Sequence, residues 1–171
     1  PVAMGPLSDK ELVFLDATIA AARERRMGLI IEPHNYCRYH GKLVGGEEVS
    51  GEALKDLWTK LAARYANEPA VVAYDLMNDP HGTKGTWPKT AQLAVDGVRA
   101  ADMKKLILVP GDSWSGAHSW VKANANLIIT DPGNNFAYEA HQYFDRDNSG
   151  TYKKSFDEEK ANPDVGVQRL E

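Results

Sequence analysis

Residues 71–82 read Val-Val-Ala-Tyr-Asp-Leu-Met-Asn-Asp-Pro-His-Gly, an apolar run that ends abruptly in amide, carboxyl and imidazole side chains. An apolar run of about four to eight residues, bounded by turn-forming residues, predicts a buried strand, here at 71–77. Three other segments repeat this design. They are Leu29–Ile31, followed by Glu32, Pro33, His34, Asn35 and Tyr36; Leu106–Val109, followed by Pro110, Gly111, Asp112, Ser113 and Trp114; and Phe136–Ala140, followed by His141, Gln142 and Tyr143. The sequence therefore predicts four strands of similar construction.

Helical patterns separate these strands. Ser8 and Glu11 form a capping box that begins one helix, and Gly28 is expected to close it. Ser50 is expected to open a second helix, whose apolar stripe places Trp58 in the core. A third helix is predicted at about 88–101, a short helix or turn at 116–121, and the start of another helix at 164–171. The apolar run 127–129 is interpreted as a connection rather than a strand, and 145–162 as a polar loop.

Strands that alternate with helices require crossover connections, which favour a parallel sheet and an α/β fold. A doubly wound nucleotide-binding sheet would carry a glycine-rich phosphate loop, and the chain has neither GxGxxG nor a Walker sequence. The alternative is a TIM (β/α)8 barrel, which typically needs about 250 residues. The prediction is therefore about four βα units of such a barrel.

Composition limits the possible partners. The chain has 171 residues, of which 43% are hydrophobic and 26% charged, as expected of a soluble globular domain. Its net charge is -4 with interspersed signs, so we expect neither nucleic acid nor a membrane as a partner. Cys37 is the single cysteine, so no internal disulfide can form. The first residues lack the pattern of a signal peptide.

The polar residues that end the four strands indicate one functional site. The carboxyl ends of parallel strands meet at a common rim, where such folds hold their active sites. Taken alone, His34 or His141 is more often a structural histidine, and Asn78-Asp79 could be an ordinary turn. Two histidines at equivalent strand ends favour a site. Trp114 can be interpreted equally as a core or a site aromatic.

Four segments together resemble the strand ends of family 5 glycoside hydrolases, with endo-β-1,4-glucanases most similar. The four segments are 31–36, 76–82, 109–117 and 138–145, in the family's order and spacing, and the similarity runs from about residue 5 to the end. The resemblance implies a retaining enzyme that acts on β-1,4-glucan, is secreted, and needs no cofactor or metal.

The resemblance also assigns roles to individual residues. Asp79 stands where the family has the glutamate that acts as general acid and base, and Asn78 would hydrogen-bond the 2-hydroxyl group of the sugar. His34 and Asn35 would line the cleft. His141 and Tyr143 would support the catalytic carboxylates, and Trp114 would offer a face on which a sugar ring stacks.

Two departures from the family limit this interpretation. The family's nucleophile is a glutamate on the seventh barrel strand, and no matching stretch is present in residues 1–171. The chain would then be a partial catalytic domain made of the third to sixth units, either a fragment of a longer enzyme or a half-barrel. Asp79 is one methylene shorter than glutamate, which predicts weak activity. Glu32 and Glu139 are expected to be buried structural acids, whereas Asp145 and Asp147 are expected to be solvated.

Other interpretations remain open at this point. The same residues could bind sugar without cleaving it, as in a carbohydrate-binding module. His34, Asp79 and His141 could hold zinc, although no compact ligand motif supports this. Finally, an incomplete barrel leaves two strand edges open, so the chain is expected to dimerise or aggregate.

Overall fold

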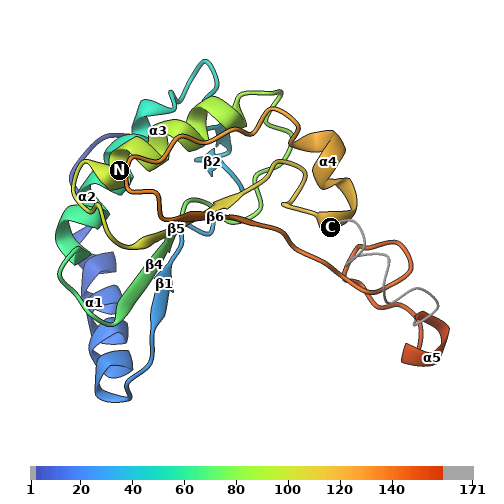
Figure 1. Cartoon of the computed structure of the whole chain (residues 1–171), viewed down its shortest axis with the longest axis horizontal. Helices are drawn as coiled ribbons and strands as arrows, with labels where there is room; N and C mark the ends of the chain where they lie inside the picture. The colour runs from blue at the N-terminus through green and yellow to red at the C-terminus, as the bar shows by residue number, and fades with distance from the viewer. Residues whose placement is uncertain (1–2, 160–171) are drawn as a thin grey trace.

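The computed structural model of the chain describes residues 3–159 (Figure 1). The helix expected at 164–171 lies outside these residues. The elements in chain order are α1 (Asp9–Glu24), β1 (Leu29–Ile31), β2 (Arg38–Tyr39), β3 (Lys42–Leu43), α2 (Glu52–Tyr65), β4 (Val71–Asp75), α3 (Trp87–Arg99), β5 (Leu106–Pro110), the 3-10 turn Ala117–Ser119, α4 (Trp120–Ala123), β6 (Phe136–Glu139) and α5 (Phe156–Glu159).

Four strands form one parallel sheet in the order β1-β4-β5-β6, so neighbours in the sheet follow one another along the chain. Each crossover between neighbours contains a helix, namely α2, α3 and α4. The sheet curves into an arch, with α2 and α3 on its convex side (Figure 1). This arrangement confirms the predicted α/β fold and is that of successive βα units from a (β/α)8 barrel.

The four predicted strands all form, with boundaries that differ by no more than two residues. β4 ends at Asp75 rather than Met77, and β5 extends to Pro110. The run 127–129 is a connection, as predicted. Its alternating burial comes from Leu127 and Ile129 packing into the core while Ile128 is exposed.

The end of α1 and the start of α2 differ from the sequence prediction, and α3 ends two residues before the predicted 101. Ser8 caps α1 as expected, its Oγ accepting from the Glu11 amide at 3.4 Å. Gly28 does not close that helix, because the left-handed residue that follows α1 is Arg26, with a φ of 56°. Gly28 is needed for another reason, since a Cβ there would lie 2.9 Å from a Val72 methyl group. α2 begins at Glu52, two residues after the predicted start.

The loop after β1 contains a small antiparallel hairpin, β2–β3, that the sequence analysis did not predict. Its two turn residues, His40 and Gly41, have φ of 46° and 78°, as a tight primed turn requires. The pair His-Gly is a weak turn signal compared with Asn-Gly, which explains the omission.

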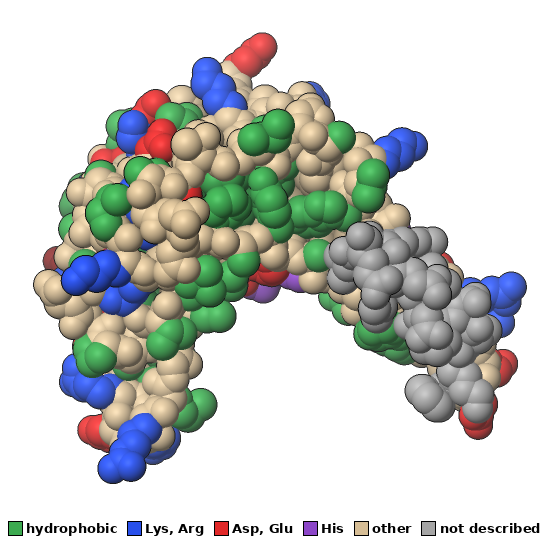
Figure 2. All heavy atoms as spheres, viewed as in Figure 1, with side chains coloured by type: hydrophobic (Ala, Val, Ile, Leu, Met, Phe, Trp, Pro, Cys, Tyr) green, Lys and Arg blue, Asp and Glu red, His purple; other side chains and the backbone are tan. Residues whose placement is uncertain are grey.

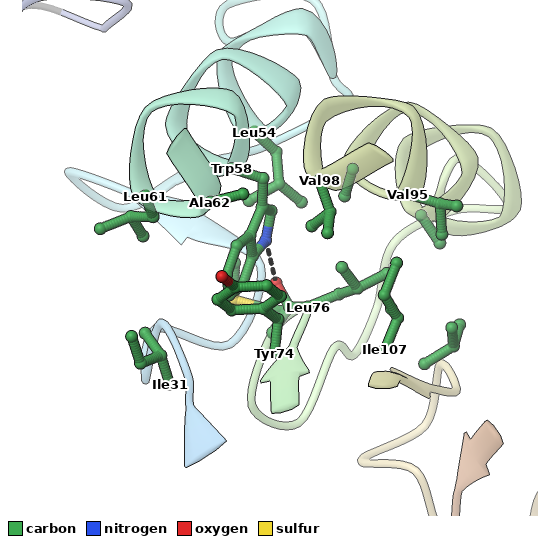
Figure 3. Close-up of a cluster of buried hydrophobic side chains, with 14 of the residues drawn as sticks. Ile31, Leu54, Trp58, Leu61, Ala62, Tyr74, Leu76, Val95, Val98 and Ile107 are labelled. Atoms are coloured by element: carbon green, nitrogen blue, oxygen red, sulfur yellow. Dashed lines mark hydrogen bonds between the residues drawn. The ribbon is translucent and has the colours of Figure 1, made fainter. Parts of the chain in front are cut away.

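The core lies between the sheet and the helices α2 and α3. Trp58 is fully buried there, as predicted, and its indole N–H donates to the Leu76 carbonyl at 3.1 Å (Figure 3). The Tyr74 ring meets the Trp58 ring edge to face, with centroids 5.5 Å apart. Tyr74 and Leu76 therefore point toward the helices, and the alternation of a strand turns Asp75 to the concave face.

The concave side of the arch carries acidic and histidine side chains at its middle (Figure 2). These groups lie where the strands end, so the fold brings the polar strand ends to one place. Within residues 3–159, every helix is too short or too polar to cross a membrane.

Candidate active site

Asp79 lies in the turn that follows β4 and faces His141, which follows β6. Its Oδ1 is 2.8 Å from Nδ1 of His141. The backbone at Asp79 is left-handed, with a φ of 45°. Non-glycine residues adopt this conformation at a cost of about 1–3 kcal/mol, and it is concentrated at functional sites. The turn thus sets the direction in which the Cα–Cβ bond of Asp79 leaves the backbone.

A cavity of about 320 Å³ opens in front of this pair. Four of the predicted site residues line it, namely Asp79, Trp114, His141 and Tyr143. Tyr143 is half-exposed, which leaves its ring available from the cavity. The loops after β4, β5 and β6 therefore supply one shared cavity.

His34 and Asn78 form a second pair beside this cavity. Nε2 of His34 is 3.3 Å from Nδ2 of Asn78, and Nδ1 of His34 is 2.7 Å from Glu32. Asn78 precedes Asp79 directly and is itself buried. The ends of β1 and β4 are thereby joined, so His34 lies at the same rim as Asp79.

Trp114 is held on a strained loop. Ser113, Trp114 and Ser115 have consecutive φ values of 60°, 57° and 54°. The Trp114 amide donates to the Pro80 carbonyl at 3.0 Å, which ties this loop to the turn at Asp79. The indole stacks on the His81 ring, with centroids 4.7 Å apart and planes 12° from parallel. Trp114 is 56% exposed, so it is not a core aromatic, and its ring lines the cavity.

Asn35 lies apart from the other predicted site residues. Its side-chain amide donates to the Arg38 carbonyl and helps to shape the loop after β1. It lines a separate hollow of about 240 Å³, whose walls are mainly apolar side chains from the N-terminal segment and α2. The structure therefore brings six of the seven predicted residues to the rim and leaves Asn35 outside.

The carboxylates of the concave face differ from their predicted environments. Glu32 is exposed rather than buried, and Glu139 is half-buried and contacts Nε2 of His141. The expectation that both are simply buried structural acids is therefore wrong. Asp145 is only 5% exposed, not solvated, because its carboxylate accepts from backbone amides of its own loop. Asp147 is exposed as predicted.

The electrostatics of the site centre on His141. The hydrogen bond with Glu139 is the main reason that the pKa of His141 rises to about 9, against the opposing effect of burial. Burial, followed by contact with Glu139 and the charge of Glu32, raises the pKa of Asp75 to about 8. Sequence reasoning missed Asp75, although its position two residues before Met77 and four before Asp79 on the strand was a usable signal.

The zinc interpretation finds no support in residues 3–159, where no group of three His, Cys, Asp or Glu side chains is arranged to hold a metal ion. His34 pairs with Glu32 and Asn78, while His141 lies between two carboxylates. The rim is instead rich in amide, hydroxyl and aromatic groups, a combination suited to sugars.

The sequence model of cellulases, glycosyl hydrolase family 5, matches residues 6–171. The chain belongs to this family. Among curated cellulase relatives, the endoglucanase gh5-1 of Neurospora crassa is 38% identical over 83% of the chain and 35% of the relative. The manganese dependent endoglucanase Eg5A of Phanerodontia chrysosporium is 32% identical over 89% of the chain and 42% of the relative.

Solved cellulase structures match the fold closely. The Pseudomonas stutzeri endoglucanase Cel5A in complex with cellobiose has a TM-score of 0.87 and 41% identity, covering 96% of this chain and 50% of that one. XacCel5A in complex with cellopentaose has a TM-score of 0.85 and 37% identity, covering 98% of this chain and 57% of that one. This family 5 chain therefore spans about half the length of the two solved structures and less than half the length of the two curated relatives.

Proposed function

We propose that this chain is part of the catalytic barrel of a retaining endo-β-1,4-glucanase and that its cavity binds a β-1,4-linked glucan. The observation that carries the proposal is the convergence of Asp79, His141 and the exposed Trp114 around one cavity. A carboxyl group beside an imidazole can exchange protons with a glycosidic oxygen, while an exposed indole offers a flat apolar face to a sugar ring.

The proposed roles follow from position. Asp79 acts as the proton donor, and His141 and Tyr143 support it from the β6 end of the cavity. Asn78 and His34 hold the sugar through hydrogen bonds beside the cleaved linkage, and this pairing keeps the Asn78 amide in a fixed orientation. Asn35 shapes the β1 loop rather than contacting the glucan.

A retaining mechanism needs a second carboxylate about 5–5.5 Å from the acid. Asp79 is the one carboxylate among the described residues that lines the cavity, since Glu139 lies behind His141. We propose that the nucleophile belongs to a barrel strand that is not among the four described here. Residues 1–171 would then be a partial catalytic domain, the third to sixth units of the barrel, and the enzyme would be secreted.

Aspartate in place of glutamate is expected to slow proton transfer. One methylene fewer withdraws the carboxyl group by roughly 1.3 Å, and a misplacement of about 1 Å can cost on the order of a hundredfold in rate. The chain alone is therefore proposed to be inactive or nearly so.

The second candidate is a protein that binds glucan without hydrolysis. The same observation favours it, because one shortened acid lines the cavity without a carboxylate partner from residues 3–159. Both candidates require the cavity to bind sugar, and they differ in whether the bond is cleaved.

We also propose that two copies of the chain associate through open strand edges. In the described sheet, β1 and β6 each have one unpaired edge, and Ile30 of β1 is 52% exposed. Unpaired edges next to apolar side chains favour pairing with another chain.

The test is to measure cellopentaose binding by calorimetry and product release by chromatography on the same sample. We expect binding without detectable cleavage, and Trp114→Ala to weaken binding at least about tenfold, or 1.4 kcal/mol. Phe14→Ala is the control, because Phe14 is an exposed aromatic on α1 that does not line the cavity. Equal weakening by both variants, or no binding by the unmodified chain, would contradict the proposal.

A further inference from the structure

Two strands of the sheet end in the same arrangement, a glutamate followed two residues later by a histidine that it contacts. The pair that follows β1 is Glu32 and His34, and the pair at the end of β6 is Glu139 and His141. In extended backbone a spacing of two turns both members of a pair to one side, and in each pair the two side chains are in contact. The two pairs provide an internal comparison, since only one of them is connected to Asp79.

The two histidines differ in what their second nitrogen faces. In His34 that nitrogen faces the Asn78 amide, whereas in His141 it faces the Asp79 carboxylate. Both nitrogens of His141 therefore face carboxylate oxygens. A neutral imidazole has a single N–H and can donate to only one of them. Oδ1 of Asp79 is buried without a hydrogen bond and lies 2.8 Å from Nδ1 of His141, so a doubly protonated His141 gives this oxygen a charged partner.

Asp75 lies behind Glu139 on the concave face and is 4% exposed. After burial, the interaction with the Glu139 carboxyl group is the main cause that raises the pKa of Asp75, and Oε2 of Glu139 is buried without a hydrogen-bond partner. A buried carboxyl group and a half-buried one that interact cannot both be ionised at low cost. A proton on Asp75 supplies the missing donor, in agreement with its raised pKa of about 8.

Glu139 is the ionised member of this pair. Burial acts to raise its pKa, but hydrogen bonds with His141 and Asp75 outweigh that effect and hold the pKa below its usual value. The order of charges from the sheet to the cavity is therefore a neutral Asp75, a negative Glu139 and a positive His141.

We propose that Glu139 and Asp75 are positioning residues, which keep His141 doubly protonated and thereby aim Asp79 into the cavity. The aiming of Asp79 matters for catalysis only if the proposed function is correct, whereas the charge state of His141 does not depend on it. An imidazolium next to Asp79 also balances the negative charge left when this residue gives up a proton.

Three other titratable side chains line the cavity together with His141 and Asp79. Tyr36, Tyr143 and His118 line the same cavity, from the β1, β6 and β5 loops. Glu32 acts on Asp75, because its negative charge helps to raise the pKa of the Asp75 carboxyl group. Among the described residues, Glu139 and Asp79 are the carboxylates that pair with His141.

The test is an NMR titration of the histidine ring resonances in the whole chain. We expect an apparent pKa of about 9 for His141. Glu139→Gln keeps the side-chain shape but removes the charge, and should lower this value by about one unit or more, a tenfold loss of proton affinity. Asp75→Leu removes the donor toward Glu139 and should lower the His141 value in the same direction, whereas Asp75→Asn retains a donor and should leave the titration nearly unchanged; equal titrations in the two variants would remove Asp75 from the proposal.

The matched control is Glu32→Gln, which removes the equivalent glutamate from the β1 pair and should not move the His141 titration. An ordinary value near 6.5 in the unmodified chain, or no shift in Glu139→Gln, would overturn the proposal. If Glu139→Gln does not fold, the ring nitrogen resonances of the unmodified chain near pH 7 decide, because a single-proton pattern would also overturn it. Failure to bind cellopentaose would refute the proposed function and leave this titration as predicted.

Discussion

Removal of the Arg99 guanidinium should cost the chain about 3–5 kcal/mol of unfolding free energy, the range measured when one partner of a buried ion pair is deleted. Arg99 at the end of α3 forms a two-pronged pair with Asp131, with N–O distances of 2.7 and 2.9 Å. Both side chains are almost completely buried, at 2% and 0% exposure. Its remaining donors reach three backbone carbonyls, each at 2.9 Å.

Arg99→Met would leave the Asp131 carboxylate buried with only two backbone amides, those of Gly133 and Asn135. It would also remove a donor from three carbonyls; that of Asn135 keeps the Ile107 amide at 3.1 Å, whereas a carbonyl left unpaired can cost about 1–3 kcal/mol. These costs do not add in full, so we expect the measured loss to lie near the upper part of the range. Because Asp131 precedes β6, the loss should loosen the strand that carries Glu139.

The assay is urea unfolding followed by tryptophan fluorescence at pH 7. Hydrogen bonding to Arg99 lowers the pKa of Asp131 to about 2, so its contribution is present above about pH 4 and is lost as the pH falls through 2. The measurement at pH 7 therefore records it in full. The control is Arg23→Met, which removes an exposed pair with Glu68 and should cost less than about 1 kcal/mol. A loss below 1 kcal/mol for Arg99→Met, equal to the control, would refute the reasoning.

Three further outcomes are expected. In a chimera that joins residues 6–171 to the remaining half of the Pseudomonas stutzeri endoglucanase Cel5A, Asp79→Glu should raise kcat by on the order of a hundredfold. An unchanged kcat would show that the shorter side chain of Asp79 does not limit proton transfer. The raised pKa of Asp75 means that its contribution to stability is present below about pH 4 and is lost as the pH rises through 8, so Asp75→Asn should flatten that slope in urea unfolding between pH 5 and 9. A slope identical to that of the unmodified chain would contradict this. Light scattering at micromolar concentration should show dimers or larger species, whereas a single monomer that unfolds cooperatively would exclude pairing through β1 and β6.

Much of the fold could be predicted because hydrophobic burial dictates it locally. The strands β4 and β5 carry apolar side chains on both faces, although Val72 is exposed, so their sequences are nearly continuous apolar runs that differ from loops. The Trp58 stripe likewise determines which face of α2 meets the sheet. The shared location of the polar strand ends could then be predicted, because a parallel sheet places the carboxyl ends of all its strands at one rim.

The remaining features depend on contacts that no local pattern encodes. Arg26 rather than Gly28 takes the left-handed position after α1, because Gly28 is required where the chain passes close to Val72. Asp145 is buried by hydrogen bonds that its own loop closes, although its neighbours are polar. Asn35 follows His34 directly, yet the hairpin after β1 turns it away from the cavity.

The most direct test of the account is a crystal structure of the chain with cellopentaose. We expect a sugar ring against the exposed face of Trp114 and sugar oxygens at about 2.7–3.2 Å from the side chains of Asn78 and Asp79. Sugar bound only in the apolar hollow beside Asn35, or a cavity that stays empty at saturating cellopentaose, would contradict the claim that these strand ends form one glucan-binding site.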